Sequence, residues 1–280
     1  MKALSFEIEG VSTYGLVTSA GIRAASTSFR QQFPDLKAVL TAGTLDNLRA
    51  NLAPIVHSSN DIHYLPLIGK PDKILCVGVN YRPHIAEMGR QVPSHPVLFV
   101  RFPGSLVGHE EAVIKPRASE QFDFEGELAI VIGRNARAVA RDEVADVIAG
   151  YTCFMDGSVR DWQSHTHQFT AGKNFARSGA IGPYLATADE VPDLPGLVLS
   201  TRVNAIEMQR ARLGDLLFDI PALIEYCSTF TELLPGDIIA TGTPGGVGAA
   251  RKPPVWLQAA DRVEVDLGPI GTLRNTVADE

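Results

Sequence analysis

The chain has 280 residues, which is enough for one large domain or for a large domain with a smaller one. Its 45% hydrophobic and 20% charged residues are ordinary for a soluble globular protein. The net charge of −7 disfavours nonspecific nucleic-acid binding, which needs a basic surface. No apolar run approaches the ~20 residues of a membrane span, so we expect neither nucleic acid nor membrane as a partner.

The first 68 residues contain few groups that could perform chemistry. They are predicted as short strands and turns, with a short helix near residues 44–53. Residues 1–7 lack the uninterrupted apolar core of a signal peptide. The stretch 66–71 combines Pro and Gly and is typical of a linker. We therefore predict a small N-terminal domain over 1–68 and a catalytic domain over 71–280.

Three cysteines bear on the cellular compartment. Cys76, Cys153 and Cys227 are widely spaced in apolar settings and form no CxxC pair. Such cysteines are typical of reduced, buried side chains with a structural role. Together with the absence of a signal peptide at residues 1–7, they predict a cytoplasmic protein.

From residue 74 onward, the sequence is rich in strand-forming runs. Gly and Pro interrupt these runs about every ten residues, which favours a β-rich α+β fold. Residues 216–228 form the clearest helix candidate. Its apolar side chains recur at three- and four-residue spacing, namely at Leu217, Ile220, Leu223, Ile224 and Cys227.

His84 and Glu87 are the first candidates for catalysis. Pro83 favours the first turn of a helix, and residues three apart on a helical turn share one face. A carboxylate beside an imidazole fixes its tautomer and raises its basicity. The pair could therefore deprotonate water as a general base; the alternative is a surface ion pair.

Glu125 and Glu127 lie in the strand-like segment 122–133. Side chains alternate between the two faces of a strand, so both carboxylates point to the same side. Two carboxylates on a mostly apolar strand repel each other and are costly to desolvate. A hard divalent cation would compensate for both. The alternative is a half-exposed strand with two solvated glutamates.

Asp156 could complete this site from the end of another apolar run. Three oxygen ligands with no Cys or nearby His favour Mg²⁺ or Mn²⁺ over Zn²⁺. Such a site keeps open positions for water or substrate, which suits Lewis-acid chemistry. Arg160 and Gln163 follow on a predicted helical turn and could face the same pocket. Arg160 could equally be a structural ion-pair partner.

Four motifs occur together in this chain. They span residues 76–87, the Glu-Gly-Glu strand with residues 156–163, residues 172–175 and residues 234–248. In this combination and order, the chain resembles the fumarylacetoacetate hydrolase family over about residues 71–275. The resemblance implies the family's β-rich catalytic fold, a rolled mixed β-sheet, with a small N-terminal domain.

The resemblance also implies roles for individual residues. His84 and Glu87 become the catalytic dyad. Lys173 lies near the metal, where a cation can stabilise an oxyanion or protonate a carbanion; a solvated surface lysine is the alternative. Gln163 and Thr243 contact the substrate. The glycines around Thr243 could also form only a tight turn, and they are not a phosphate loop, because a Gly-Lys-Ser/Thr ending is absent.

Other positions are assigned away from the chemistry or depart from the family. His165 and His167 are interpreted as part of a mobile loop that covers the substrate, and His109 as structural. The stretch 175–179 lacks the aspartate that many relatives carry there. Residues 76–79 contain no acid, so we expect only three protein carboxylates on the metal.

These residues support cleavage of a C–C bond in a 2,4-dioxo acid. The His84–Glu87 dyad activates water, Lys173 stabilises the oxyanion, and the broken bond leaves a pyruvate enolate and a carboxylic acid. We therefore expect a hydrolase of acylpyruvate or fumarylpyruvate type in aromatic-compound catabolism. Oxaloacetate decarboxylase and 2-hydroxydienoate isomerase are alternatives on the same enolate chemistry. A noncatalytic metal-binding protein is the alternative from another class, and intact His84, Glu87 and Lys173 argue against it.

The resemblance also implies a homodimer. Phe99, Phe102 and Leu106 could form part of a shared surface. They could equally fill the core of the same chain.

Overall fold

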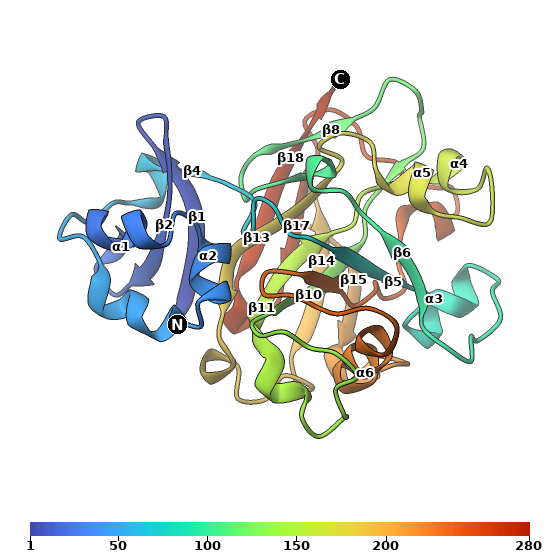
Figure 1. Cartoon of the computed structure of the whole chain (residues 1–280). Coiled ribbons are helices and arrows are strands. Elements are labelled where there is room, and N and C mark those ends of the chain that lie inside the picture. The colour runs from blue at the N-terminus through green and yellow to red at the C-terminus, as the bar shows by residue number, and fades with distance from the viewer.

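A mixed sheet of eleven strands runs through the computed structural model, which describes residues 1–280 (Figure 1). Nine strands follow the order β3-β2-β1-β13-β11-β10-β16-β5-β6, while β4 pairs with β1 and β7 with β13. The bounds are β1 (Lys2–Ile8), β2 (Val11–Thr18), β3 (Gly21–Ala24), β4 (His63–Tyr64), β5 (Ile74–Gly78), β6 (Val97–Val100), β7 (Leu106–Val107), β10 (Gly126–Ile132), β11 (Ile148–Met155), β13 (Gly179–Ala186) and β16 (Ile238–Ala240). The structure thus confirms the predicted β-rich α+β class.

A second, five-stranded sheet packs against the first in the order β15-β14-β17-β18-β8. Its strands are β15 (Ile206–Arg212), β14 (Val198–Val203), β17 (Arg262–Asp266), β18 (Thr272–Asp279) and β8 (Ala112–Lys115), and a separate pair joins β9 (Phe122–Asp123) to β12 (Ser158–Val159). Strand β10 is buried on both faces. Leu128 and Ile130 join the core between the sheets, whereas Ala129 and Val131 join the core toward the N-terminal segment.

The N-terminal segment lies to one side in Figure 1 and is continuous with the large sheet. Lys2 pairs with Ala186, and Ala3 packs in one apolar cluster with Val131 of β10. Within the predicted linker, Leu67 is buried in that same cluster. The domain boundary near residues 68–71 stays a prediction. The segment also contains α1 (Thr27–Gln32), α2 (Leu36–Thr41) and the 3₁₀ helices η1 (Leu45–Asn51) and η2 (Ser59–Asp61), and η1 occupies the place of the predicted short helix.

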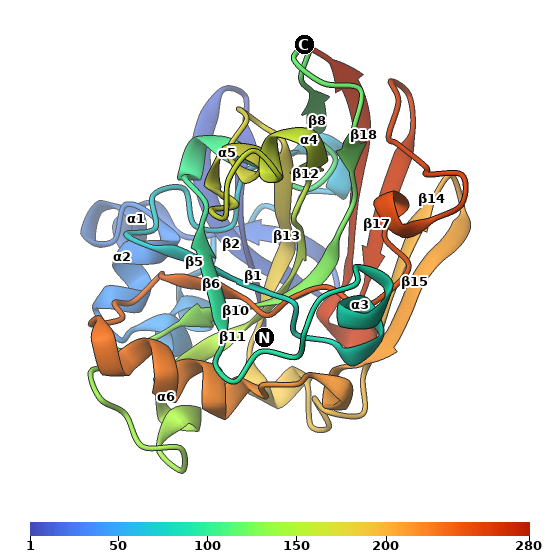
Figure 2. The same ribbon diagram turned by 90° about the vertical axis from the view of Figure 1, so that its right-hand side faces the viewer.

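The helices of the remaining chain are short. Three of them, α3 (Arg82–Glu87), α4 (Arg160–Gln163) and α5 (Thr170–Lys173), lie on the side away from the N-terminal segment, which Figure 2 turns toward the viewer. The others are α6 (Ile220–Phe230) and the 3₁₀ turns η3 (Pro103–Ser105), η4 (Val144–Val147), η5 (Ala188–Glu190), η6 (Leu213–Asp215), η7 (Gly248–Ala250) and η8 (Gly268–Ile270). None of these helices combines the length and the apolar character of a transmembrane helix.

Helix α6 begins four residues later than predicted. The Asp219 carboxylate accepts the N–H of Ala222 at 3.0 Å, and Pro221 occupies the first turn, so the N-terminus is fixed at this point. The predicted Leu217 therefore precedes the helix. The other four predicted apolar positions are buried, namely Ile220, Leu223, Ile224 and Cys227.

The three apolar residues considered for a dimer surface differ in their exposure to solvent. Phe99 and Leu106 are buried in the core of the chain, as the alternative interpretation held, whereas Phe102 is 55% exposed. The three cysteines, Cys76, Cys153 and Cys227, are unpaired and buried as predicted.

Candidate active site

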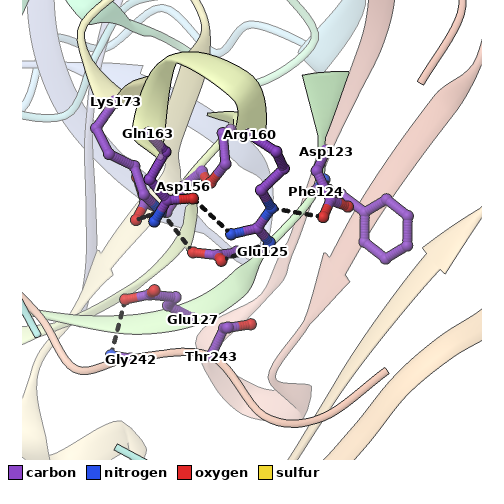
Figure 3. Close-up of polar contacts among 12 residues, drawn as sticks. Asp123, Phe124, Glu125, Glu127, Asp156, Arg160, Gln163, Lys173, Gly242 and Thr243 are labelled. Carbon is purple, nitrogen blue, oxygen red and sulfur yellow. Dashed lines mark hydrogen bonds and ion pairs between the residues drawn. The ribbon is translucent and has the colours of Figure 1, made fainter. Parts of the chain in front are cut away.

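Three carboxylates meet where β10 and β11 lie side by side. Asp156 follows the end of β11, and its N–H donates to the carbonyl of Glu125 at 2.8 Å. This pairing brings ligand oxygens of Glu125, Glu127 and Asp156 within 4.8 Å of one another (Figure 3). The three residues are 5%, 1% and 0% exposed, which excludes the alternative of two solvated glutamates.

Gly126, between Glu125 and Glu127, allows this part of the chain to lie close to the second sheet. A Cβ at this position would lie 2.0 Å from Oγ1 of Thr201 in β14, well inside van der Waals contact. The glycine therefore lets β10 approach the second sheet closely. Its N–H donates to Oε1 of Gln209 at 2.9 Å, which adds a second tie between the sheets.

Two cations neutralise part of this acidic cluster. Nζ of Lys173 lies 2.6 Å from both Glu125 Oε2 and Asp156 Oδ2, and the Arg160 guanidinium lies 2.7 Å from Glu125 Oε1. Burial alone would raise the pKa of Glu125, but Lys173 and Arg160 hold that pKa below its usual range. Burial alone would lower the pKa of Lys173, but Asp156 and Glu125 raise it. Lys173 is therefore a buried ammonium and not a solvated surface lysine.

Glu127 has no such cation beside it. Its Oε2 accepts only the N–H of Gly242 at 2.8 Å (Figure 3). Burial, with Asp156 and Glu125 nearby, raises the pKa of Glu127 well above its usual range. A divalent cation bound to all three carboxylates would compensate for this charge. The purely oxygen donor set fits Mg²⁺ or Mn²⁺.

The predicted dyad forms on α3. Nδ1 of His84 lies 2.8 Å from Oε1 of Glu87, and Oε2 of Glu87 accepts the N–H of Gly246 at 2.8 Å. His84 is 6% exposed, whereas the Glu87 side chain is 22% exposed, so the imidazole of the pair is buried. Because Glu87 engages Nδ1, Nε2 is the nitrogen left to exchange a proton.

The glycine-rich loop after β16 donates hydrogen bonds from its main-chain N–H groups to carboxylates of the site. Besides Gly242 and Gly246, the N–H groups of Gly248 and Ala249 donate to Asp123 at 2.8 and 2.9 Å. The loop is thus more than a tight turn. The Thr243 hydroxyl accepts from Gln209 at 2.7 Å and donates to the Gly126 carbonyl at 3.0 Å, although the residue also borders the pocket.

Two residues that bind side chains of the site escaped the sequence interpretation. Asp123 binds the Arg160 guanidinium at 2.8 Å, so Arg160 serves both as an ion-pair partner and as a pocket residue. Arg101, only 2% exposed, donates to Oδ1 of Asp156 at 2.5 Å. Period-two spacing with Glu125 would have pointed to Asp123. Nothing in the sequence pairs Arg101 with Asp156.

The remaining predicted positions lie outside the pocket. His165 and His167 are exposed on the loop between α4 and α5, and their substrate-covering role stays a prediction. His109 packs against Tyr64, accepts the Arg274 N–H at 3.0 Å, and burial lowers its pKa to about 4. In the stretch 175–179, which lacks the family's aspartate, the Ser178 hydroxyl accepts a hydrogen bond from Arg101 at 2.9 Å. Arg101 also binds Asp156, so Ser178 contacts the site only through this arginine.

A small cavity of about 20 Å³ lies between these groups, large enough for one ion or water. Apolar side chains close its other walls, including Phe99 and Phe169. An acidic cluster, an imidazole base and a buried ammonium thus face one space. This arrangement can hold a cation, bind an anionic oxo acid and exchange a proton with it. The predicted residues that line the cavity are His84, Glu125, Glu127, Arg160, Gln163, Lys173 and Thr243.

The fold and this site define an enzyme with a small-molecule site built on three carboxylates. The chain belongs to the fumarylacetoacetate hydrolase family, because the family model "Fumarylacetoacetate (FAA) hydrolase C-terminal" matches residues 73–278.

Named relatives carry several activities. Oxaloacetate tautomerase Fahd2a, mitochondrial, of Rattus norvegicus is 38% identical over 80% of this chain and 72% of its own. Oxaloacetate tautomerase YisK of Bacillus subtilis (strain 168) is 37% identical over 81% and 76%. A putative HpcE protein from Mycobacterium smegmatis superposes with a TM-score of 0.90 at 31% identity, covering 100% and 99%. Maleylpyruvate hydrolase from Sphingobium sp. SYK-6, in complex with manganese (II) ion and pyruvate, gives 0.80 at 28%, covering 100% and 99%.

Proposed function

We propose that this protein is a divalent-metal-dependent enzyme that interconverts the keto and enol forms of a 2-oxo dicarboxylic acid, with oxaloacetate as the first candidate substrate. The observation that carries the proposal is that His84, held by Glu87, borders the same cavity as Glu125 and Glu127 of the three-carboxylate cluster. Such a site can take a proton from the carbon beside a 2-oxo group and stabilise the enolate that results. The relatives named as oxaloacetate tautomerases support this choice of reaction.

The proposed mechanism assigns one task to each residue. Glu125, Glu127 and Asp156 would hold Mg²⁺ or Mn²⁺, which when bound supplies Lewis-acid polarisation of the 2-oxo group. Nε2 of His84 takes the proton from C3 of the substrate, while Glu87 keeps the other ring nitrogen protonated and oriented. The C–H electron pair becomes the C2–C3 double bond, and the former carbonyl oxygen gains the negative charge.

The enolate is then neutralised. The Lys173 ammonium stabilises the charge on the oxygen, and the proton that Nε2 of His84 took from C3 passes to that oxygen and completes the enol. The reverse sequence returns the keto acid. Gln163, Arg160 and Thr243 border the same cavity, and we propose that they orient the substrate carboxylate.

Hydrolysis of a 2,4-dioxo acid, the reaction expected from the sequence, is the second candidate. A specific observation favours it, because a carboxylate-bound imidazole at 2.8 Å is equally suited to deprotonate water. The solved maleylpyruvate hydrolase relative also supports it. The predicted role in aromatic-compound catabolism applies to this hydrolase reaction. Oxaloacetate decarboxylation remains an alternative reaction at the same site.

One substrate panel separates these reactions. Decay of the enol band of oxaloacetate and pyruvate release from oxaloacetate, acetylpyruvate and fumarylpyruvate would be measured with Mg²⁺, Mn²⁺ and EDTA. We expect cation-dependent enol decay that is much faster than pyruvate release. Pyruvate from the dioxo acids with unaccelerated enol decay would establish the hydrolase instead. Absence of turnover with every substrate would support the alternative of a noncatalytic metal-binding protein.

We further propose a cytoplasmic location. The three unpaired, buried cysteines support it, since such thiols suit a reducing compartment. Fractionation of the native cells with an antibody against the protein would test it, and recovery in a membrane or secreted fraction would contradict it.

A further inference from the structure

The basic side chains around the cavity differ in the contacts that they make. His84, Arg160 and Lys173 each contact a carboxylate, at 2.6–2.8 Å. Arg90 borders the same cavity but forms neither an ion pair nor a side-chain hydrogen bond within the chain. Its side chain is exposed, and its guanidinium lies 5.1 Å from the centre of the Phe169 ring. Arg90 thus presents free N–H donors at the cavity.

The backbone around Arg90 is well fixed. Gly89 adopts a left-handed conformation with φ +62° after α3, and its N–H donates to the Ala86 carbonyl at 3.1 Å. The N–H of Arg90 donates to the Ile85 carbonyl at 3.0 Å. Arg90 is therefore attached directly to the helix that carries His84 and Glu87, so its position is coupled to theirs.

A second hollow of about 330 Å³ continues outward from the cavity. The two share Met88, Arg90, Arg160 and Gln163, and Trp256 borders the outer one. Arg90 therefore lies at the junction between the carboxylate cluster and the outer hollow. A substrate whose oxo-acid end lies at the cluster would extend its other end past Arg90.

We propose that Arg90 binds the distal carboxylate of the substrate and thereby selects 2-oxo acids that carry a second negative charge. A guanidinium can donate two parallel hydrogen bonds to a carboxylate, which makes the contact strong and directional. The identity of the oxo-acid end rests on the proposed function. The selection for a second charge rests only on the free guanidinium and the outer hollow.

Binding of two inert ligands to the manganese-loaded protein tests this inference. N-oxalylglycine carries an oxo-acid end and a distal carboxylate, whereas N-ethyloxamate has the same end with a neutral tail. Isothermal titration calorimetry would compare wild type, Arg90→Met and Arg82→Met. Arg82 is the matched control, because it lies on the helix to which Arg90 is attached, is exposed and does not border the cavity.

We expect wild type to bind N-oxalylglycine at least about tenfold more tightly than N-ethyloxamate, as a charge-assisted hydrogen bond allows. Arg90→Met should remove this preference with N-ethyloxamate affinity unchanged within about twofold, while Arg82→Met should keep it. Equal affinities in wild type, equal loss of both ligands in Arg90→Met, or no binding of either ligand would overturn the inference. A preserved preference in an enzyme that does not turn over oxaloacetate would instead contradict the proposed function alone.

Discussion

Glu127 and Glu125 are two residues apart, yet they have different surroundings. Glu125 has Lys173 and Arg160 as partners, whereas Glu127 depends on a backbone N–H and on whatever cation the cluster binds. We expect Glu127→Gln to weaken Mn²⁺ binding by more than about tenfold, because a ligand contributes at least as much as its outer partners do. Folding should be intact, since the amide oxygen can still accept the Gly242 N–H. Calorimetric titration with Mn²⁺ and a thermal melt would check both expectations.

Glu110→Gln provides the control for this experiment. Glu110 is exposed and takes no part in the carboxylate cluster, so the control should bind Mn²⁺ as wild type does. Undiminished binding in Glu127→Gln would remove this residue from the ligand set.

The dyad can be tested separately from the metal site. His84→Ala should keep Mn²⁺ affinity but lower turnover by about 10²–10⁴-fold, because it removes only the base. Steady-state kinetics on oxaloacetate and on the dioxo acids would measure the loss. His63→Ala, an exposed change on β4 that does not border the cavity, should behave as wild type. If His84→Ala retains every activity, the proton is exchanged by another group.

For single residues, the sequence predicted the positions of the acidic side chains better than it predicted the basic side chains that bind them. Period-two spacing was enough to place Glu125 and Glu127 on one face, because strand geometry is local. The buried contact between Arg101 and Asp156 joins the residues that follow β6 and β11, strands that are not neighbours in the sheet. No local pattern encodes such a contact.

Strand β10 depends on a glycine at its start. Gly126→Ala should destabilise the protein by about 1–3 kcal/mol, because the added methyl group would overlap Oγ1 of Thr201. Chemical denaturation monitored by fluorescence would measure the change. Combining it with Thr201→Ala removes that oxygen, so the double variant should recover part of the loss. Strictly additive effects would show that the two residues do not interact.

The elements themselves were predictable to different degrees. Apolar spacing identified the buried face of α6, but the Asp219 cap, and not the apolar pattern, determines where the helix begins. The pairing order of the large sheet could not be predicted from local patterns. It joins β16 to β5, strands far apart in the chain, and depends on long-range packing.

Assembly is a property of the whole molecule that we propose from the family resemblance. Sedimentation equilibrium at micromolar concentration should give about twice the 30.1 kDa of one chain. Phe102 is the one member of the suggested surface that is exposed, so Phe102→Ser should weaken the dimer. Phe230→Ser, at another exposed phenylalanine, is the matched control. A mass of one chain at all concentrations would refute the dimer.

We expect the N-terminal segment to contribute stability more than chemistry. A fragment of residues 69–280 retains all nine predicted site residues but loses the strand paired with β13 and part of one apolar cluster. We expect this fragment to bind Mn²⁺ as the full chain does and to unfold at a lower temperature. Calorimetric titration would measure the Mn²⁺ affinity, and differential scanning calorimetry would measure the unfolding temperature. An unchanged melting temperature would support an independent domain over 71–280.

The glycine-rich loop has a consequence for how this enzyme can change over time. It holds Glu127, Glu87 and Asp123 through main-chain N–H groups, which every residue except proline supplies. Ala249 shows this division: its N–H binds Asp123, while the residue also borders the outer hollow. A larger side chain at Ala249 could reshape the hollow without releasing Asp123. New substrates could therefore be acquired by mutation at this rim while the acids of the reaction centre stay in place.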